Sequence, residues 1–147
     1  MCKINIENDS ITNFNEVFLK LKNEYKINQV RLKSDKSIIY ESLEYFFIKD
    51  YRFKVYFEIQ KSSLKEVILH WVDGELYKSD WENVNEKKLN QEIDVLKSFY
   101  EKLLGSAPVK GNRDYFWKKK WGILSIISNP RDFNVVTYIR IKNELVG

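Results

Sequence analysis

The chain has 147 residues, of which 44% are hydrophobic, 15% aromatic and 31% charged, and its net charge is +4. This profile predicts one globular domain over residues 1–147, and the single cysteine, Cys2, excludes an intramolecular disulfide and a zinc site built from several thiolates. No segment approaches the ~20 apolar residues of a membrane span and the N-terminus lacks the apolar core of a signal peptide, so we expect a cytoplasmic protein without a membrane partner.

The first predicted element is an amphipathic helix. Asn13 is followed three residues later by Glu16, as in a capping box, and apolar residues then recur at helical spacing. We therefore expect a helix over 13–26. Residues 29–33 alternate apolar and polar side chains, which predicts a short strand.

Strands are expected to dominate the middle of the chain. Residues 37–48 fit both a helix and a strand, and their β-branched and aromatic content favours the strand. Residues 53–59 alternate regularly and predict a half-buried strand, as do residues 67–71. The Asp73-Gly74 dipeptide then predicts a tight hairpin into a further strand at 75–77.

A long helix and a hairpin are expected in the last part of the chain. Leucines and other apolar residues recur at helical spacing over 89–104, and Gly105 supplies a C-terminal cap. Residues 121–128 and 135–142 predict two strands joined by the turn sequence at 129–132. The predicted fold is α+β: an antiparallel sheet with an N-terminal helix and a long helix before a C-terminal β-hairpin.

Candidate catalytic residues are isolated. His70, the only histidine, has no neighbouring nucleophile motif, and Cys2 has no positioned base. The five glycines are too scattered to form a phosphate-binding loop. Asp50, Glu58 and Gln60 resemble the ligand spacing of Asp and Glu-x-Lys nucleases, with Gln60 in place of the lysine. We predict no catalytic residue, metal site or cofactor, and a hydrolase or nuclease is the third hypothesis.

A basic and aromatic segment near residue 117 is the strongest candidate for binding nucleic acid. Aromatic rings stack on bases while lysines neutralise phosphates, which suits single-stranded nucleic acid. In the competing interpretation the rings pack beneath the long helix and the lysines are only solvated. Because one dense segment does not make a groove, nucleic acid is the alternative partner rather than the first. The residues in question are Tyr115, Trp117, Lys118, Lys119 and Lys120.

An acidic stretch before the long helix is the predicted protein interface. Aromatic rings interleaved with carboxylates suit an interface with a basic partner, although the dipole of a helix alone favours acidic residues near its start. The predicted partner-binding residues are Asp73, Glu75, Tyr77, Asp80, Trp81 and Glu82.

The C-terminal third carries a family resemblance in three short runs: Trp121-Gly122-Ile123, Asn129-Pro130-Arg131-Asp132 and Tyr138-Ile139-Arg140-Ile141. With the size and the α+β layout, they resemble the hairpins of immunity proteins that bacteria encode beside polymorphic and contact-dependent growth-inhibition toxins. The resemblance implies a protein-binding inhibitor rather than an enzyme, with a cognate toxin domain as partner. Such an inhibitor occludes the toxin's active or substrate-binding site, and an interface of this kind buries about 1,600 Å².

Overall fold

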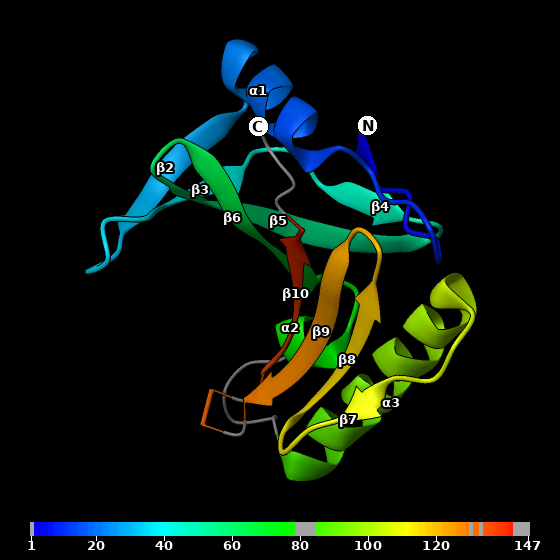
Figure 1. Cartoon of the computed structure of the whole chain (residues 1–147). Helices are drawn as coiled ribbons and strands as arrows, with labels where there is room; N and C mark the ends of the chain where they lie inside the picture. Colours follow the sequence, from blue (N-terminus) through cyan, green and yellow to red (C-terminus); the bar gives the residue numbers. More distant parts are fainter. Residues whose placement is uncertain (1, 79–84, 130, 133, 143–147) are drawn as a thin grey trace.

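The computed structural model describes residues 2–78, 85–129, 131–132 and 134–142 (Figure 1). Its elements, in chain order, are β1 (Cys2–Lys3), α1 (Phe14–Asn23), β2 (Ile27–Leu32), β3 (Ile38–Ser42), β4 (Phe46–Ile48), β5 (Tyr51–Gln60), β6 (Ser63–Trp71), α2 (Glu75–Lys78), α3 (Glu86–Leu104), β7 (Val109–Lys110), β8 (Asp114–Lys119), β9 (Gly122–Asn129) and β10 (Asn134–Ile141).

The strands form one strongly curved sheet, which confirms the predicted α+β class. Its order is β1-β4-β5-β6-β10-β9-β8-β7, and β3 pairs with β5 beyond β4 and carries β2 at its outer edge. All pairings are antiparallel except that of β1 with β4. In Figure 1, α1 lies near the β2–β3 end of the sheet and α3 lies beside β8 and β9.

Both predicted helices begin and end near the expected residues. Asn13 caps α1, because its side-chain oxygen accepts a hydrogen bond from the Glu16 backbone N–H at 3.2 Å. Gly105 ends α3 in the left-handed conformation at φ +72°, and its N–H donates to the Glu101 carbonyl oxygen at 2.8 Å. The local capping signals in the sequence therefore operate in the fold.

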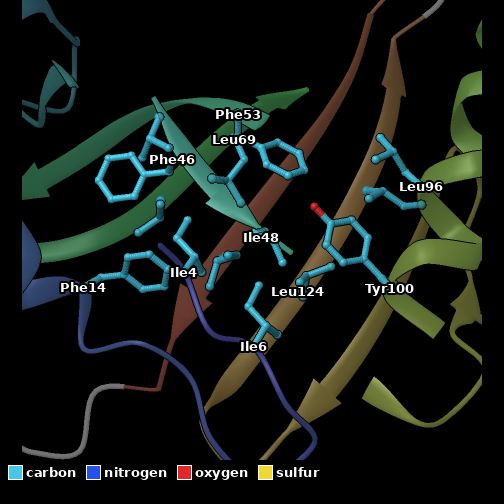
Figure 2. Close-up of a cluster of buried hydrophobic side chains, with 14 of the residues drawn as sticks. Ile4, Ile6, Phe14, Phe46, Ile48, Phe53, Leu69, Leu96, Tyr100 and Leu124 are labelled. Carbon is cyan, nitrogen blue, oxygen red and sulfur yellow. The ribbon is translucent and has the colours of Figure 1, made fainter. Parts of the chain in front are cut away.

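The hydrophobic core fills the space between the sheet, α1, α3 and the N-terminal segment (Figure 2). Phe53 and Leu69 point into it from the sheet, and Ile4 enters it from the segment after β1. Tyr100 of α3 is fully buried there, and its hydroxyl shares a 2.8 Å hydrogen bond with the Thr137 hydroxyl of β10.

The predicted hairpin at Asp73-Gly74 is wrong, because residues 75–78 form the short helix α2. Strand β6 pairs with β5 on one side and with β10 on the other, so a returning strand has no free edge beside it. Gly74 instead allows close packing, since a Cβ there would collide with the Glu92 carboxylate and lie 2.8 Å from the Trp71 ring. Gly74 is accommodated here because the backbone lies close to α3, and not because the chain forms a hairpin turn.

Two further sequence predictions agree with the structure. Residues 37–48 are strands, β3 and β4, as favoured, and the C-terminal hairpin is confirmed as β9 and β10. The segment around residue 117, for which the sequence analysis named no element, is strand β8. None of the described helices is both long enough and apolar enough to cross a membrane.

Candidate functional site

One face of the sheet, opposite the core, carries the candidate site. Cross-strand partners share a face in an antiparallel sheet, so the strand register identifies the residues of this face. We call it the open face and define it by Asn28, Arg31, Ile39, Glu41, Lys54, Tyr56, Glu58, Glu66, Ile68, His70, Asp114, Phe116, Lys118, Ile123, Ser125, Ile127, Val136, Tyr138 and Arg140.

The centre of the open face is a row of side chains that crosses five strands. The register pairs Tyr56 with Ile68, Ile68 with Tyr138, Tyr138 with Ser125, and Ser125 with Phe116. These side chains are all partly exposed. The row therefore presents three aromatic rings and one aliphatic side chain on a rigid, hydrogen-bonded support, which is the composition of many protein interface cores.

Two adjoining hollows lie on this face. One has a volume of about 450 Å³ and spans from Val30 and Arg31 to His70 and Tyr138. The other, of about 370 Å³, lies over β9 and β10, and the two share Glu66 and Tyr138 as lining residues. Within the described parts of the chain, both are lined by strand residues without a helical residue, and Lys33 also lines the larger hollow.

Glu58 is the most constrained charged residue of the open face, with 2% exposure. Its Oε2 accepts hydrogen bonds from the Ser37 hydroxyl at 2.8 Å and from Lys33 Nζ at 3.1 Å, and it lies 3.3 Å from Lys65 Nζ. Burial opposes ionisation, but these hydrogen bonds prevail and lower the pKa of Glu58. This carboxylate is a structural anion that fixes two lysines beside the hollow.

Glu66 has the opposite balance, although it lies directly across from Glu58 in the β5–β6 register. Burial and the nearby charge of Glu58 raise the pKa of Glu66, and Arg140 is its attractive partner at 3.5 Å. The two neighbouring carboxyl groups therefore titrate over different pH ranges. Arg140 itself is 63% exposed and reaches outward from the face.

His70 lies between the hollow and the edge of the open face. Its ring meets the Tyr56 ring edge-on, with a centroid distance of 5.6 Å, and burial lowers its pKa. Within the described residues, no carboxylate hydrogen-bonds to this imidazole. His70 is therefore a neutral polar member of the surface, and the geometry supplies no acid-base pair for it.

The predicted acidic site is only partly described. Asp73 forms an exposed 3.0 Å ion pair with Arg52, Glu75 belongs to α2, and Tyr77 is 50% exposed. Burial and the neighbouring Tyr45 and Glu41 oxygens raise the pKa of Tyr77. Asp80, Trp81 and Glu82 lie outside the described residues.

The basic and aromatic segment is divided between the two faces of β8. Trp117 is 2% exposed and donates from its indole N–H to the Ser106 carbonyl oxygen at 2.9 Å. Tyr115 packs against the core, with the Lys97 ammonium 5.1 Å above its ring. The buried Trp117 ring is not available as a stacking platform for bases, and the Tyr115 ring is only partly exposed.

The lysines of the same segment also separate. Lys119 donates to the Leu104 carbonyl oxygen at 3.3 Å and to the Ser106 hydroxyl at 3.0 Å, which caps the end of α3. Lys118 belongs to the open face, and Lys120 follows β8 as an exposed residue. The structure thus assigns these predicted residues to three different environments.

The carboxylates considered for a nuclease site do not converge. Asp50 precedes β5 and Glu58 lies eight residues farther along the same strand, a separation of about 26 Å at ~3.3 Å per residue. Gln60 is directed toward the Asp35 carbonyl oxygen, at 3.5 Å. No group of three or more metal-ligating side chains occurs in the part of the chain that the structure describes.

Sequence reasoning missed the open face as a unit. The alternation of residues 53–59 did place Tyr56 and Glu58 on the polar side of a strand. However, β10 lies between β6 and β9 in the sheet. The sequences of these strands contain no local signal that predicts this order. Tyr138 therefore could not be placed beside Ile68 from the sequence.

Comparison with known proteins does not identify a family: no family model, curated protein or solved structure matches this chain at a significant level.

Proposed function

We propose that this chain is a protein-binding inhibitor of the immunity type, which neutralises a cognate toxin by covering the toxin's active or substrate-binding site with the open face. The mechanism is occlusion, so it requires a preformed surface and no chemistry. The resemblance of the C-terminal hairpin to immunity proteins supports this class, and the surface chemistry of the open face supports the location.

The observation that carries the proposal is the aromatic row on the open face. Tyr56, Ile68, Tyr138 and Phe116 form a partly exposed strip on paired strands, so little conformational entropy is lost when a partner covers it. Tyrosine rings combine apolar area with a polar end, and they are enriched among the residues that dominate binding energy. A catalytic site would instead need converging reactive groups.

The size of the face suits an interface. The seven strands from β2 through β3, β5, β6, β10 and β9 to β8 span about 29 Å at ~4.8 Å per pairing. A standard interface covers about 800 Å² on each partner, which is a square of about 28 Å on a side. One partner domain would therefore cover the width of these seven strands.

The test begins with the genes beside the one for this chain, among which the proposal requires one that encodes a toxin domain. That domain is expressed in bacteria with the wild-type protein or with the variant Tyr56→Thr/Tyr138→Thr, and growth and affinity are measured. Threonine is β-branched and, like tyrosine, is favoured in strands, so the change preserves strand propensity while removing both rings. The control is Tyr25→Asn, at a tyrosine that is 89% exposed and outside the open face, because asparagine tolerates the φ of +56° at this position.

We expect the wild type and Tyr25→Asn to restore growth and the double variant to fail. A hot-spot tyrosine contributes about 2 kcal/mol, so each ring should change the affinity about thirtyfold. Thermal melts of all three proteins establish that the variants are folded. A folded double variant that binds the toxin domain as tightly as the wild type would exclude the open face, and a wild type that neither binds nor protects would refute the inhibitor proposal.

A further inference from the structure

We infer that the protein surface recognised by the open face is acidic, which rests on the proposed function and specifies the kind of partner. The sequence analysis had predicted the reverse, a basic partner that docks on acidic residues near Asp73. The reason for the change is the distribution of exposed charge on the open face.

Every well-exposed charged side chain of the open face is cationic. These side chains are Arg31 on β2, Arg140 on β10 and Lys118 on β8. The four acidic residues of the same face are less exposed: Glu58 is buried under its lysine and serine partners, and Glu66 is largely buried beside Arg140. Glu41 is half-buried and forms a 3.6 Å ion pair with Lys54, and Asp114 is half-buried. A docking partner therefore meets positive charge first.

The three cations lie in one row beside the aromatic row. The register pairs Arg31 with Ile39 at one end, and it pairs Arg140 with Ile123 and Ile123 with Lys118 at the other. Three strands lie between Arg31 and Arg140 and one strand lies between Arg140 and Lys118, which gives spacings of about 19 Å and 10 Å at ~4.8 Å per pairing. A partner surface with carboxylates at such intervals around an apolar centre would complement both the row of cations and the aromatic row.

The same row disfavours a nucleic acid as the occupant. A bound strand places phosphates at short, regular intervals and needs a continuous track of cations. Here Glu58 and Glu66 are paired across β5 and β6, in the same row between Arg31 and Arg140, and they interrupt such a track. The rings of Trp117 and Tyr115 face the core side of β8 and cannot extend it. Isolated carboxylates on a folded protein can contact the cations without approaching Glu58 and Glu66, so they avoid electrostatic repulsion by these two side chains.

The test uses three polymers as probes: poly-L-glutamate, poly-L-lysine and a 20-residue oligo(dT), each labelled for fluorescence anisotropy at about 50 mM salt, where charge effects are strong. The variant Arg31→Glu/Lys118→Glu/Arg140→Glu reverses the cations of the open face. The control variant Lys22→Glu/Lys87→Glu/Lys102→Glu makes the same change of net charge at exposed residues of α1 and α3. A thermal melt confirms that each variant is folded.

We expect wild-type protein to bind poly-L-glutamate more tightly than the other two probes, with affinity reduced about tenfold or more in the open-face variant and nearly unchanged in the control. Equal losses in both variants would mean that only net charge matters, and would overturn the inference. Preferred binding of poly-L-lysine would also overturn it. Tighter binding of oligo(dT), lost in the open-face variant, would make the face a nucleic-acid site instead.

If Arg140→Glu destabilises the fold through Glu66, the variant Arg31→Glu/Lys118→Glu carries the same test, because neither residue forms an ion pair in the described structure. The growth assay separates this inference from the proposed function. Loss of protection on removal of the tyrosines, with protection retained after charge reversal, would refute the acidic partner alone. Retention of protection in both cases would refute the open face itself.

Discussion

Replacement of Glu58 by glutamine should destabilise the fold, because this buried carboxylate fixes three donors at once. Ser37, Lys33 and Lys65 all lie within 3.3 Å of its Oε2. The amide of Glu58→Gln retains the shape of the side chain, but it removes the negative charge and presents an N–H group to lysines that have only hydrogens to donate.

The expected cost is about 2 kcal/mol of unfolding free energy. Breaking a buried ion pair by removing one partner costs about 3–5 kcal/mol when the remaining charge is trapped. Here the lysine side chains are 34% and 32% exposed and regain water, and Lys65 keeps its 3.1 Å pair with Asp35. Both effects reduce the cost below the value for a fully buried pair.

The difference between the two proteins should depend on pH. The pKa of Glu58 is lowered in the folded state, so the carboxylate adds stability above its unfolded pKa of about 4.3, and this contribution is lost as the pH falls through the lowered pKa. Once Glu58 is protonated, it is nearly equivalent to glutamine. The wild type should therefore exceed Glu58→Gln by about 2 kcal/mol at neutral pH, and by progressively less in acid.

Urea unfolding followed by circular dichroism at about pH 7 and at several values below about pH 4 measures this difference directly. Asp94→Asn is the matched control, because it removes a carboxylate from an exposed position of α3, where substitutions typically change stability by less than about 0.5 kcal/mol. A Glu58→Gln protein as stable as the control at neutral pH, or a difference that stays constant in acid, would contradict the role assigned to this carboxylate.

Three further predictions concern the core, the hairpin and the thiol. Tyr100→Phe leaves the buried Thr137 hydroxyl without its 2.8 Å partner and should cost about 1 kcal/mol in a thermal or urea melt. Gly122→Ala should destabilise the protein by several times that amount, because φ is +147° and a Cβ would collide with a backbone oxygen of β10. Burial and the hydrogen bond to Glu44 raise the pKa of Cys2 to about 11, so its alkylation at about pH 8 should be about a hundredfold slower than that of free cysteine and partly restored in Glu44→Gln.

The elements of the fold were largely predictable, because their signals are local. The cap residues Asn13 and Gly105 and the alternation of residues 53–59 each act within a few positions of the chain. The failure at Asp73-Gly74 has a nonlocal cause: β6 already has neighbours on both sides. A turn dipeptide predicts a hairpin only when the preceding strand has a free edge, and the sequence does not show which edges are free.

The candidate site depended on pairings between distant strands, and the sequence analysis could not supply them. The high density of basic and aromatic residues in one segment therefore did not predict a functional surface. In β8, successive side chains alternate between faces, so Trp117 enters the core while Phe116 and Lys118 join the open face. In this way, about half of the side chains in a dense cluster on one strand lie on the opposite face of the sheet. A functional surface on a sheet is assembled across strands, and here its cations and tyrosines come from β2, β5, β8 and β10, each of which contributes one or two residues that are unremarkable in their own segment.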